Sequence, residues 1–187
     1  MKGSKTLKRR KFIQVAAAAA ASGPLVSCGG PKPPWRFFTA GEAAVVNSLC
    51  ETIIPADQDP GAGWAGVVRY IDRQLHRWFK ENRETYRLGV AAIEKTAQKA
   101  HGKSFVELSP DERTAMVASI EKGQAPAELW QGVSQKEFFD LILNHTMQGF
   151  YGDPRHGGNR DMVSWKMLGV PATAIRGRQH YEFPPQS

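Results

Sequence analysis

The side chains best suited to chemistry gather in the stretch Gly149–Pro171, which has the sequence GFYGDPRHGGNRDMVSWKMLGVP. Asp153, His156 and Asp161 are carboxylates and an imidazole, the groups that proteins use for general acid–base catalysis. Two arginines, which bind carboxylates and phosphates through paired N–H donors, lie between them. These are Arg155 and Arg160. Such crowding in a turn-rich loop is typical of an active site or of a contact surface.

The rest of the chain supplies no catalytic constellation to support this loop. The two Glu-x-x-His pairs of a di-iron bundle, His-Glu-x-x-His, Gly-x-Ser-x-Gly and both glycine-rich nucleotide-binding signatures do not occur. Only two cysteines are present, and Cys-x-x-Cys-His is absent. The sequence therefore predicts neither a metal site nor a cofactor in this chain. An enzyme that uses Asp153, His156 and Asp161 for acid–base chemistry remains an alternative.

The elements that position the loop are predicted to be helices. Apolar residues recur at helical spacing in successive segments, and no alternating strand pattern occurs. The fold class is therefore all-α, a single irregular bundle of about six helices with a long turn-rich loop and an extended C-terminal tail. The helices are expected over 39–54, 64–80, from 86 to near 102, 110–122, from 135 to near 149, and around Trp165–Leu168.

Capping residues and buried positions refine this expectation. A hydroxyl followed three residues later by a carboxylate predicts a capping box at Thr39, Ser109 and Ser134. In the 64–80 helix, an apolar face is expected to include Trp78, with Asp72 on the opposite, charged side. Further positions are expected in or at the edge of the core: Cys50 as a small apolar residue, His145 as a hydrogen-bonded histidine and Trp130 as a plug.

The N-terminal residues predict an export signal followed by a lipid attachment site. Arg9 and Arg10 precede Phe12 and a short apolar run, which matches the twin-arginine pattern. The run is too short to span a membrane. Leu-Val-Ser before Cys28 resembles a bacterial lipobox, so Cys28 is predicted to be the lipidated first residue of a periplasmic, membrane-anchored protein. A cleaved signal with an unmodified Cys28 is the alternative.

Three regions are therefore expected: a signal peptide over 1–27, a flexible tether over 28–36 and a helical domain over 37–187. Charge supports the division, because six of the 25 Lys and Arg residues precede position 28 and none of the 18 acids does. The 19 remaining basic residues nearly balance the 18 acids, so six of the seven net positive charges belong to the signal. A nearly neutral domain has little of the excess positive charge on which nucleic-acid binding depends.

Several longer segments together resemble one family. They are Phe37–Asp57 (FFTAGEAAVVNSLCETIIPAD), Gly66–Leu75 (GVVRYIDRQL), Gly149–Pro154, Gly157–Asp161 and Trp165–Pro171, in addition to the twin-arginine signal. In this order they resemble the small subunit, called subunit 3 or gamma, of membrane-bound, FAD-dependent gluconate 2-dehydrogenase. The resemblance covers nearly all of the chain after the signal.

The resemblance implies a non-catalytic subunit of an oxidoreductase complex. Its partner would be a large flavoprotein of the glucose-methanol-choline type that holds FAD, and a cytochrome c subunit with haem c often completes such complexes. The small subunit would support folding of the flavoprotein, its co-export and its attachment to the membrane. The lipobox departs from the better-known members, whose complexes are attached through the cytochrome.

Surplus aromatic and arginine residues in the loop favour a protein contact surface. The residues predicted to contact the partner are Tyr151, Asp153, Arg155, His156, Asn159, Arg160, Asp161 and Trp165. The alternative function is a stand-alone periplasmic lipoprotein that binds a small anion through the main-chain amides of Gly157 and Gly158 with Arg155 and Arg160.

Overall fold

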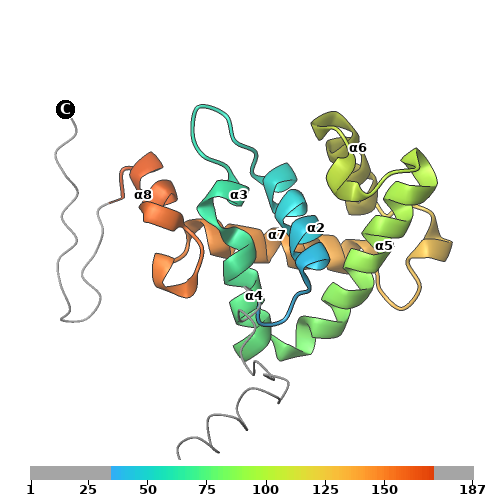
Figure 1. Cartoon of the computed structure of the whole chain (residues 1–187), viewed down its shortest axis with the longest axis horizontal. Coiled ribbons are helices and arrows are strands. Elements are labelled where there is room, and N and C mark those ends of the chain that lie inside the picture. Colours follow the sequence, from blue (N-terminus) through green and yellow to red (C-terminus); the bar gives the residue numbers. More distant parts are fainter. Residues whose placement is uncertain (1–34, 171–187) are drawn as a thin grey trace, which may run out of the picture. The chain divides into compact units, whose positions relative to one another are not determined.

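A computed structural model describes residues 35–170 of the chain. The twin-arginine pair Arg9 and Arg10, the lipobox at Cys28, most of the expected tether and the tail from Pro171 lie outside the described residues. Within residues 35–170 the fold is all-α, as predicted, with seven α-helices and no strand (Figure 1). The helices are α2 (Ala40–Ile53), α3 (Ala62–Ala65), α4 (Val67–Arg77), α5 (Arg83–His101), α6 (Pro110–Glu121), α7 (Gln135–Tyr151) and α8 (Val163–Met167).

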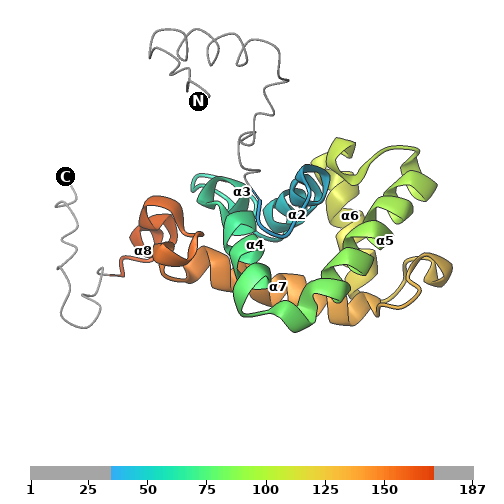
Figure 2. The same cartoon turned by 60° about the horizontal axis from the view of Figure 1, so that its bottom comes forward.

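Helix α7 is the element on which the other helices pack. It contacts α2, α3, α4, α5, α6 and α8, and α4 and α5 diverge above it from the short turn η1 (Lys80–Asn82) (Figure 2). Large apolar side chains from these helices form one core. Its fully buried members include Val46, Leu49, Ile71, Leu75, Ile93, Phe138, Ile142 and Phe150. Within the described residues, no helix is long and apolar enough to cross a membrane.

The predicted capping boxes are confirmed at two helix starts. Thr39 accepts from the N–H of Glu42 while the Glu42 carboxylate accepts from the N–H of Thr39. Ser109 begins α6 in the same way. Ser134 accepts from the N–H of Glu137 at 3.3 Å, but the structure has no return bond from the Ser134 N–H to the Glu137 side chain. Helix α5 ends at Gly102, whose φ of 67° closes the last turn.

The prediction of a single helix over residues 64–80 was wrong. Gly66 has a φ of 75°, which separates the short helix α3 from α4, and α4 ends at Arg77. Glycine adopts this left-handed conformation without the steric cost that a Cβ atom imposes. Because the helix stops at Arg77, the periodic pattern no longer places Trp78 inward. Trp78 is 74% exposed, contrary to the prediction.

Asp72 was expected on the charged side of α4, and this prediction was also wrong. The side chain is buried, with 2% of its surface exposed. Its carboxylate accepts the main-chain N–H groups of Arg36, Phe37 and Phe38 at 2.8, 2.9 and 3.0 Å. These three donors precede α2 and have no helical acceptor, so the carboxylate satisfies them and is itself compensated for its burial.

Cys50, His145 and Trp130 lie in the core, as predicted. Burial raises the pKa of the Cys50 thiol to about 12, so the thiol is inert and cannot reach a partner chain. His145 Nδ1 is 2.9 Å from the hydroxyl of Tyr86, and its ring stacks on Phe79 with centroids 4.6 Å apart. The indole N–H of Trp130 donates to the hydroxyl of Thr96.

Candidate functional site

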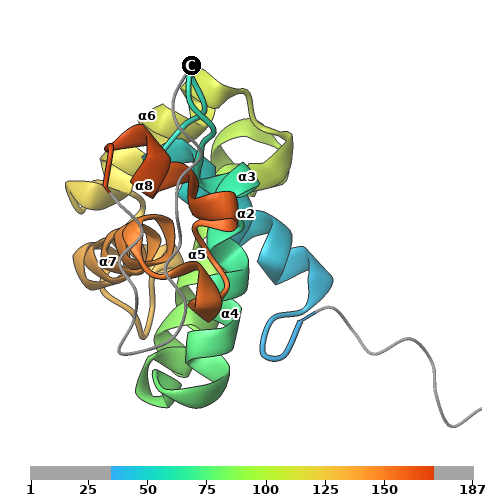
Figure 3. The ribbon, with the colours of Figure 1, turned by 90° about the vertical axis from the view of Figure 1, so that its left-hand side faces the viewer.

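The predicted contact residues lie in the segment that follows α7, which we call the 151–165 loop. It leaves α7 at Tyr151 and passes through the turns η4 (Pro154–His156) and η5 (Arg160–Met162) into α8. Through η5 and Gly157, the loop lies beside α3 and the first half of α4 (Figure 3). The long loop predicted here is therefore a compact, locally helical structure that rests on the bundle.

Asn159 ties the two ends of this loop together. Its side-chain amide donates to the carbonyl of Gly152 at 2.9 Å, and its carbonyl oxygen accepts the N–H of Ser164 at 3.0 Å. The second bond satisfies a main-chain N–H in the first turn of α8. Asn159 is fully buried. We therefore remove it from the predicted contact residues, because its side chain is used inside the loop.

A second bond across the loop fixes Trp165. Its indole N–H donates to the carbonyl of Tyr151 at 2.8 Å, at the end of α7 where helical carbonyls lack partners. Both residues are half-buried. Trp165 therefore braces the loop with its nitrogen and leaves part of its ring accessible.

The backbone of the loop is tightly packed and strained. A Cβ atom on Gly158 would lie 2.0 Å from the carbonyl oxygen of Gly149, so the loop crosses α7 at main-chain contact distance. Within residues 35–170, the only non-glycine residues with positive φ are Asn159, Asp161 and Met162, all in this loop. Such conformations cost about 1–3 kcal/mol each and persist where the surroundings enforce them.

Asp153 and Arg155 form an ion pair at the start of η4. Arg155 Nη2 lies 3.0 Å from the Asp153 carboxylate, and the Arg155 main-chain N–H donates to the same group at 2.9 Å. Burial raises the pKa of Asp153, but the hydrogen bonds from Arg155 outweigh it and hold the pKa below its usual value. Asp153 thus remains a carboxylate that shapes the turn.

The remaining predicted residues are on the surface. Arg155, His156, Arg160 and Asp161 are exposed, whereas Asp153 is half-buried. Within residues 35–170, the His156 imidazole makes no hydrogen bond to the side chain of Asp153 or of Asp161, and the Asp153 carboxylate is engaged by Arg155. The arrangement does not connect the three groups as an acid, a base and their orienting partner. It presents separate charged side chains to solvent.

Three further residues, which the sequence did not indicate as part of this site, lie beside the loop in the structure. The guanidinium of Arg160 lies over the Trp64 ring at 5.4 Å from its centroid. Arg73 donates from Nη1 to the carbonyl of Arg155 at 3.4 Å. Arg69 is exposed one turn before Arg73 on the same helix. The signal in the sequence was this four-residue spacing of arginines in α4, but only the fold brings them to the loop.

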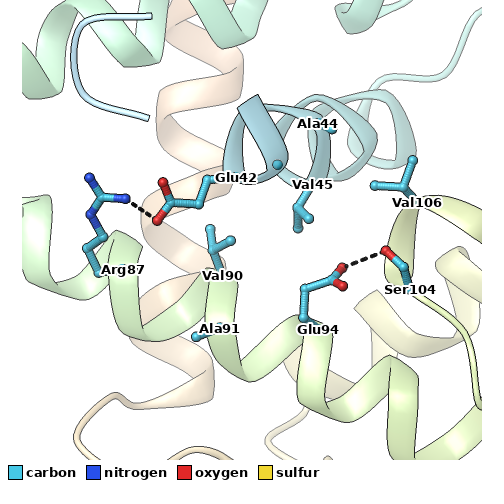
Figure 4. Close-up of a pocket in the computed structure, with 10 residues that line it drawn as sticks. Glu42, Ala44, Val45, Arg87, Val90, Ala91, Glu94, Ser104 and Val106 are labelled. Carbon is cyan, nitrogen blue, oxygen red and sulfur yellow. Dashed lines mark hydrogen bonds and ion pairs between the residues drawn. The ribbon is translucent and has the colours of Figure 1, made fainter. Parts of the chain in front are cut away.

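A separate groove of about 450 Å³ lies between α2, α5 and the turn η2 (Phe105–Glu107) (Figure 4). Its floor is apolar and includes Val45 and Val90. Its charged groups are already bonded: Glu42 pairs with Arg87, and Glu94 accepts from the Ser104 hydroxyl at 3.3 Å. Among the residues that line the groove, no polar side chain is left to orient a ligand.

The chain is similar to one known protein family. Residues 40–171 match the family described as gluconate 2-dehydrogenase subunit 3. The chain belongs to this family. The match begins at the first residue of α2 and includes every helix that the structure describes, together with the 151–165 loop. No curated protein and no solved structure matches the chain.

Membership of the gluconate 2-dehydrogenase subunit 3 family confirms the resemblance found in the sequence. The family name describes a subunit, which assigns the chain to a dehydrogenase complex of more than one subunit. Within residues 35–170, no group of three or more His, Cys, Asp or Glu side chains is arranged to hold a metal ion.

The geometry also bears on the small-anion alternative. The main-chain N–H of Gly157 donates to the carbonyl of Pro154 at 3.1 Å, and the Arg155 guanidinium is paired with Asp153. Two of the four groups required by an anion site in this subunit 3 protein are thus already bonded. An anion that displaced these contacts would lose part of the free energy of binding in doing so.

Proposed function

We propose that this chain is the non-catalytic small subunit of a periplasmic, FAD-dependent dehydrogenase of sugars or sugar acids. In this proposal the glucose-methanol-choline type flavoprotein holds FAD and performs the chemistry, and a cytochrome c subunit accepts the electrons in complexes that contain one. The small subunit helps the flavoprotein fold, carries it through the twin-arginine route and attaches it to the membrane.

The family match over residues 40–171 is the observation that carries this proposal. The form of the 151–165 loop supports it. The loop is held by Asn159 and Trp165 from inside, while Arg155, His156, Arg160 and Asp161 face solvent. A rigid surface loses little conformational entropy on binding, which favours association with a partner.

Co-purification after export tests the subunit assignment. The tagged chain is produced in its native host and is recovered from the periplasm in mild detergent. We expect the flavoprotein to be recovered with its FAD, and we expect the small subunit alone to show no turnover. If the tagged chain never recovers a flavoprotein, the subunit assignment is wrong.

Two variants separate the export and anchoring parts of the proposal. Replacing Arg9 and Arg10 with lysine should leave both proteins in the cytoplasm, because the flavoprotein is proposed to depend on this signal. Replacing Cys28 with serine should release the exported complex from the membrane without preventing its assembly. A flavoprotein that reaches the periplasm with the Arg9→Lys/Arg10→Lys chain would contradict co-export.

A melting experiment examines the small-anion alternative. A ligand that binds only the folded chain raises its melting temperature according to RT ln(1 + [L]/Kd). Phosphate, gluconate and citrate are added to the isolated protein. We expect no shift, and a concentration-dependent shift that Arg160→Gln removes would favour the alternative.

A further inference from the structure

The 151–165 loop and the α3–α4 corner form one continuous surface. Arg160 lies over Trp64, and Arg73 donates to the carbonyl of Arg155. A Cβ atom on Gly66 would lie 3.6 Å from the Gly157 carbonyl oxygen and 3.7 Å from Arg160 Nη2. Contacts this close mean that the loop and the helix corner present their side chains together.

Five residues define what we call the arginine surface. They are Trp64, Arg69, Arg73, Arg155 and Arg160. Arg155 pairs with Asp153, whereas no ion pair within residues 35–170 involves Arg69, Arg73 or Arg160. Asp161 is the exposed acid of the same loop. Since the chain from Cys28 onward has almost balanced charge, this surface is a local excess of cations.

The composition of the arginine surface matches a protein partner that offers carboxylates. All four cations are arginines, whose planar guanidinium binds a carboxylate through two parallel hydrogen bonds. Trp64 is 44% exposed beneath one of them, and exposed tryptophan beside arginine is typical of the residues that contribute most to protein interfaces. The contacts with Trp64 and with the Arg155 carbonyl hold two guanidinium groups in place, which reduces the entropy that binding would cost.

We propose that the arginine surface docks onto an acidic patch, made of Asp and Glu side chains, on the flavoprotein subunit. This inference rests on the proposed function, and it adds the chemical character of the interface and the residues of α3 and α4 that complete it. The docking pairs Arg69, Arg73 and Arg160 with partner carboxylates and covers the exposed part of Trp64.

The experiment compares two charge-reversed variants of the small subunit, each co-produced with the flavoprotein. The test variant is Arg69→Glu/Arg160→Glu, which changes two exposed side chains of the arginine surface. The control is Lys95→Glu/Lys136→Glu, which makes the same charge change on α5 and at the opposite end of α7. Melting of each isolated small subunit verifies folding, and Arg69→Gln/Arg160→Gln replaces the test variant if it does not fold.

Dissociation constants are measured at low and high salt. We expect the test variant to bind at least about tenfold more weakly than the natural chain, because like charges then face each other, and the control to bind within about twofold of the natural chain. The affinity of the natural chain should fall as salt rises, and that of the test variant should fall less.

Three results would overturn the inference in distinguishable ways. If the natural chain recovers the flavoprotein and the test variant binds as tightly as the control, the arginine surface is not the interface, while the proposed function stands. If the test variant keeps the flavoprotein but no longer binds vesicles of phosphatidylglycerol and phosphatidylethanolamine, the surface contacts lipid instead. If the natural chain recovers no flavoprotein, the proposed function itself has failed.

Discussion

The buried carboxylate of Asp72, in the middle of α4, accepts the main-chain N–H of Phe38 at 3.0 Å across 34 positions of sequence. The same carboxylate accepts the N–H groups of Arg36 and Phe37. One side chain therefore fixes the path by which the chain enters α2. Phe38, thus positioned, packs its ring against Tyr86 with centroids 5.8 Å apart.

Replacing Asp72 with asparagine should destabilise the fold. The amide offers one acceptor where the carboxylate offers two, and its NH₂ group would face an N–H donor. We expect the free energy of unfolding to fall by about 2–4 kcal/mol, as judged from buried hydrogen bonds to charged groups. Urea unfolding measures the change. Asp140→Asn, an exposed residue of α7, is the matched control, and equal effects of the two substitutions would contradict the role of Asp72.

Two substitutions at Asn159 separate its side-chain bonds from its backbone conformation. Asn159 has a φ of 46°, which glycine adopts freely and alanine does not. Asn159→Gly should cost about 2 kcal/mol through the two lost hydrogen bonds, and Asn159→Ala should cost about 1 kcal/mol more. Limited proteolysis should then cut the 151–165 loop faster in both variants. Unchanged cleavage would show that Asn159 does not hold the loop.

Glycine substitutions should have opposite effects at two sites. In Gly158→Ala the new Cβ atom would meet the Gly149 carbonyl oxygen, so the backbones of the loop and α7 must separate. We expect a loss of about 3 kcal/mol or more. Gly41 lies in α2 with nothing within 4 Å of a Cβ atom, so Gly41→Ala should be neutral or slightly stabilising. Thermal unfolding compares the two, and a neutral Gly158→Ala would contradict the close crossing.

Stability should depend on pH through His145. Burial lowers the pKa of His145 from 6.5 to about 4, so the unfolded chain takes up a proton on this residue at a higher pH than the folded chain does. The free energy of unfolding should therefore fall as the pH falls from about 6.5 to about 4 and change no further through this residue below that. The decrease in the free energy of unfolding through His145 is at most about 3 kcal/mol.

The variant His145→Asn keeps an acceptor for the Tyr86 hydroxyl but cannot titrate. Its free energy of unfolding should be lower at neutral pH and should change less between pH 6.5 and pH 4 than that of the natural chain. His76 is exposed, so His76→Asn should leave the pH dependence unchanged. Equal slopes in the natural chain and in His145→Asn would exclude His145 as the cause.

Features decided by neighbouring residues could be predicted from the sequence. The helix start at Thr39 depends on Glu42, three positions away, and the end at Gly102 depends on one glycine. Features that depend on residues far apart in the sequence could not be predicted from it. Asp72 is polar and therefore seemed to belong on the charged face, but its partners are main-chain groups more than 30 positions earlier.

The candidate site shows the same difference between features that depend on neighbouring residues and features that depend on distant ones. Its proposed location in the 151–165 loop rests on the crowding of turn formers and charges, and the family match includes that region. The burial of Asn159 did not follow, because an asparagine in a polar loop looks like a surface residue. Trp64 and Arg69 were missed because about 90 positions separate them from Arg160 and only the fold brings them together.

The central place of α7 affects how the chain folds as it is made. Because α7 is synthesised after α2 to α6 yet packs against all of them except the intervening turns, the core cannot close until Phe150 has been added. Ribosomes add roughly 5–20 residues per second, so the stretch from α2 to the end of α7 takes on the order of 5–20 s. During that time the face of α2 that α7 later covers remains open to aggregation and proteolysis.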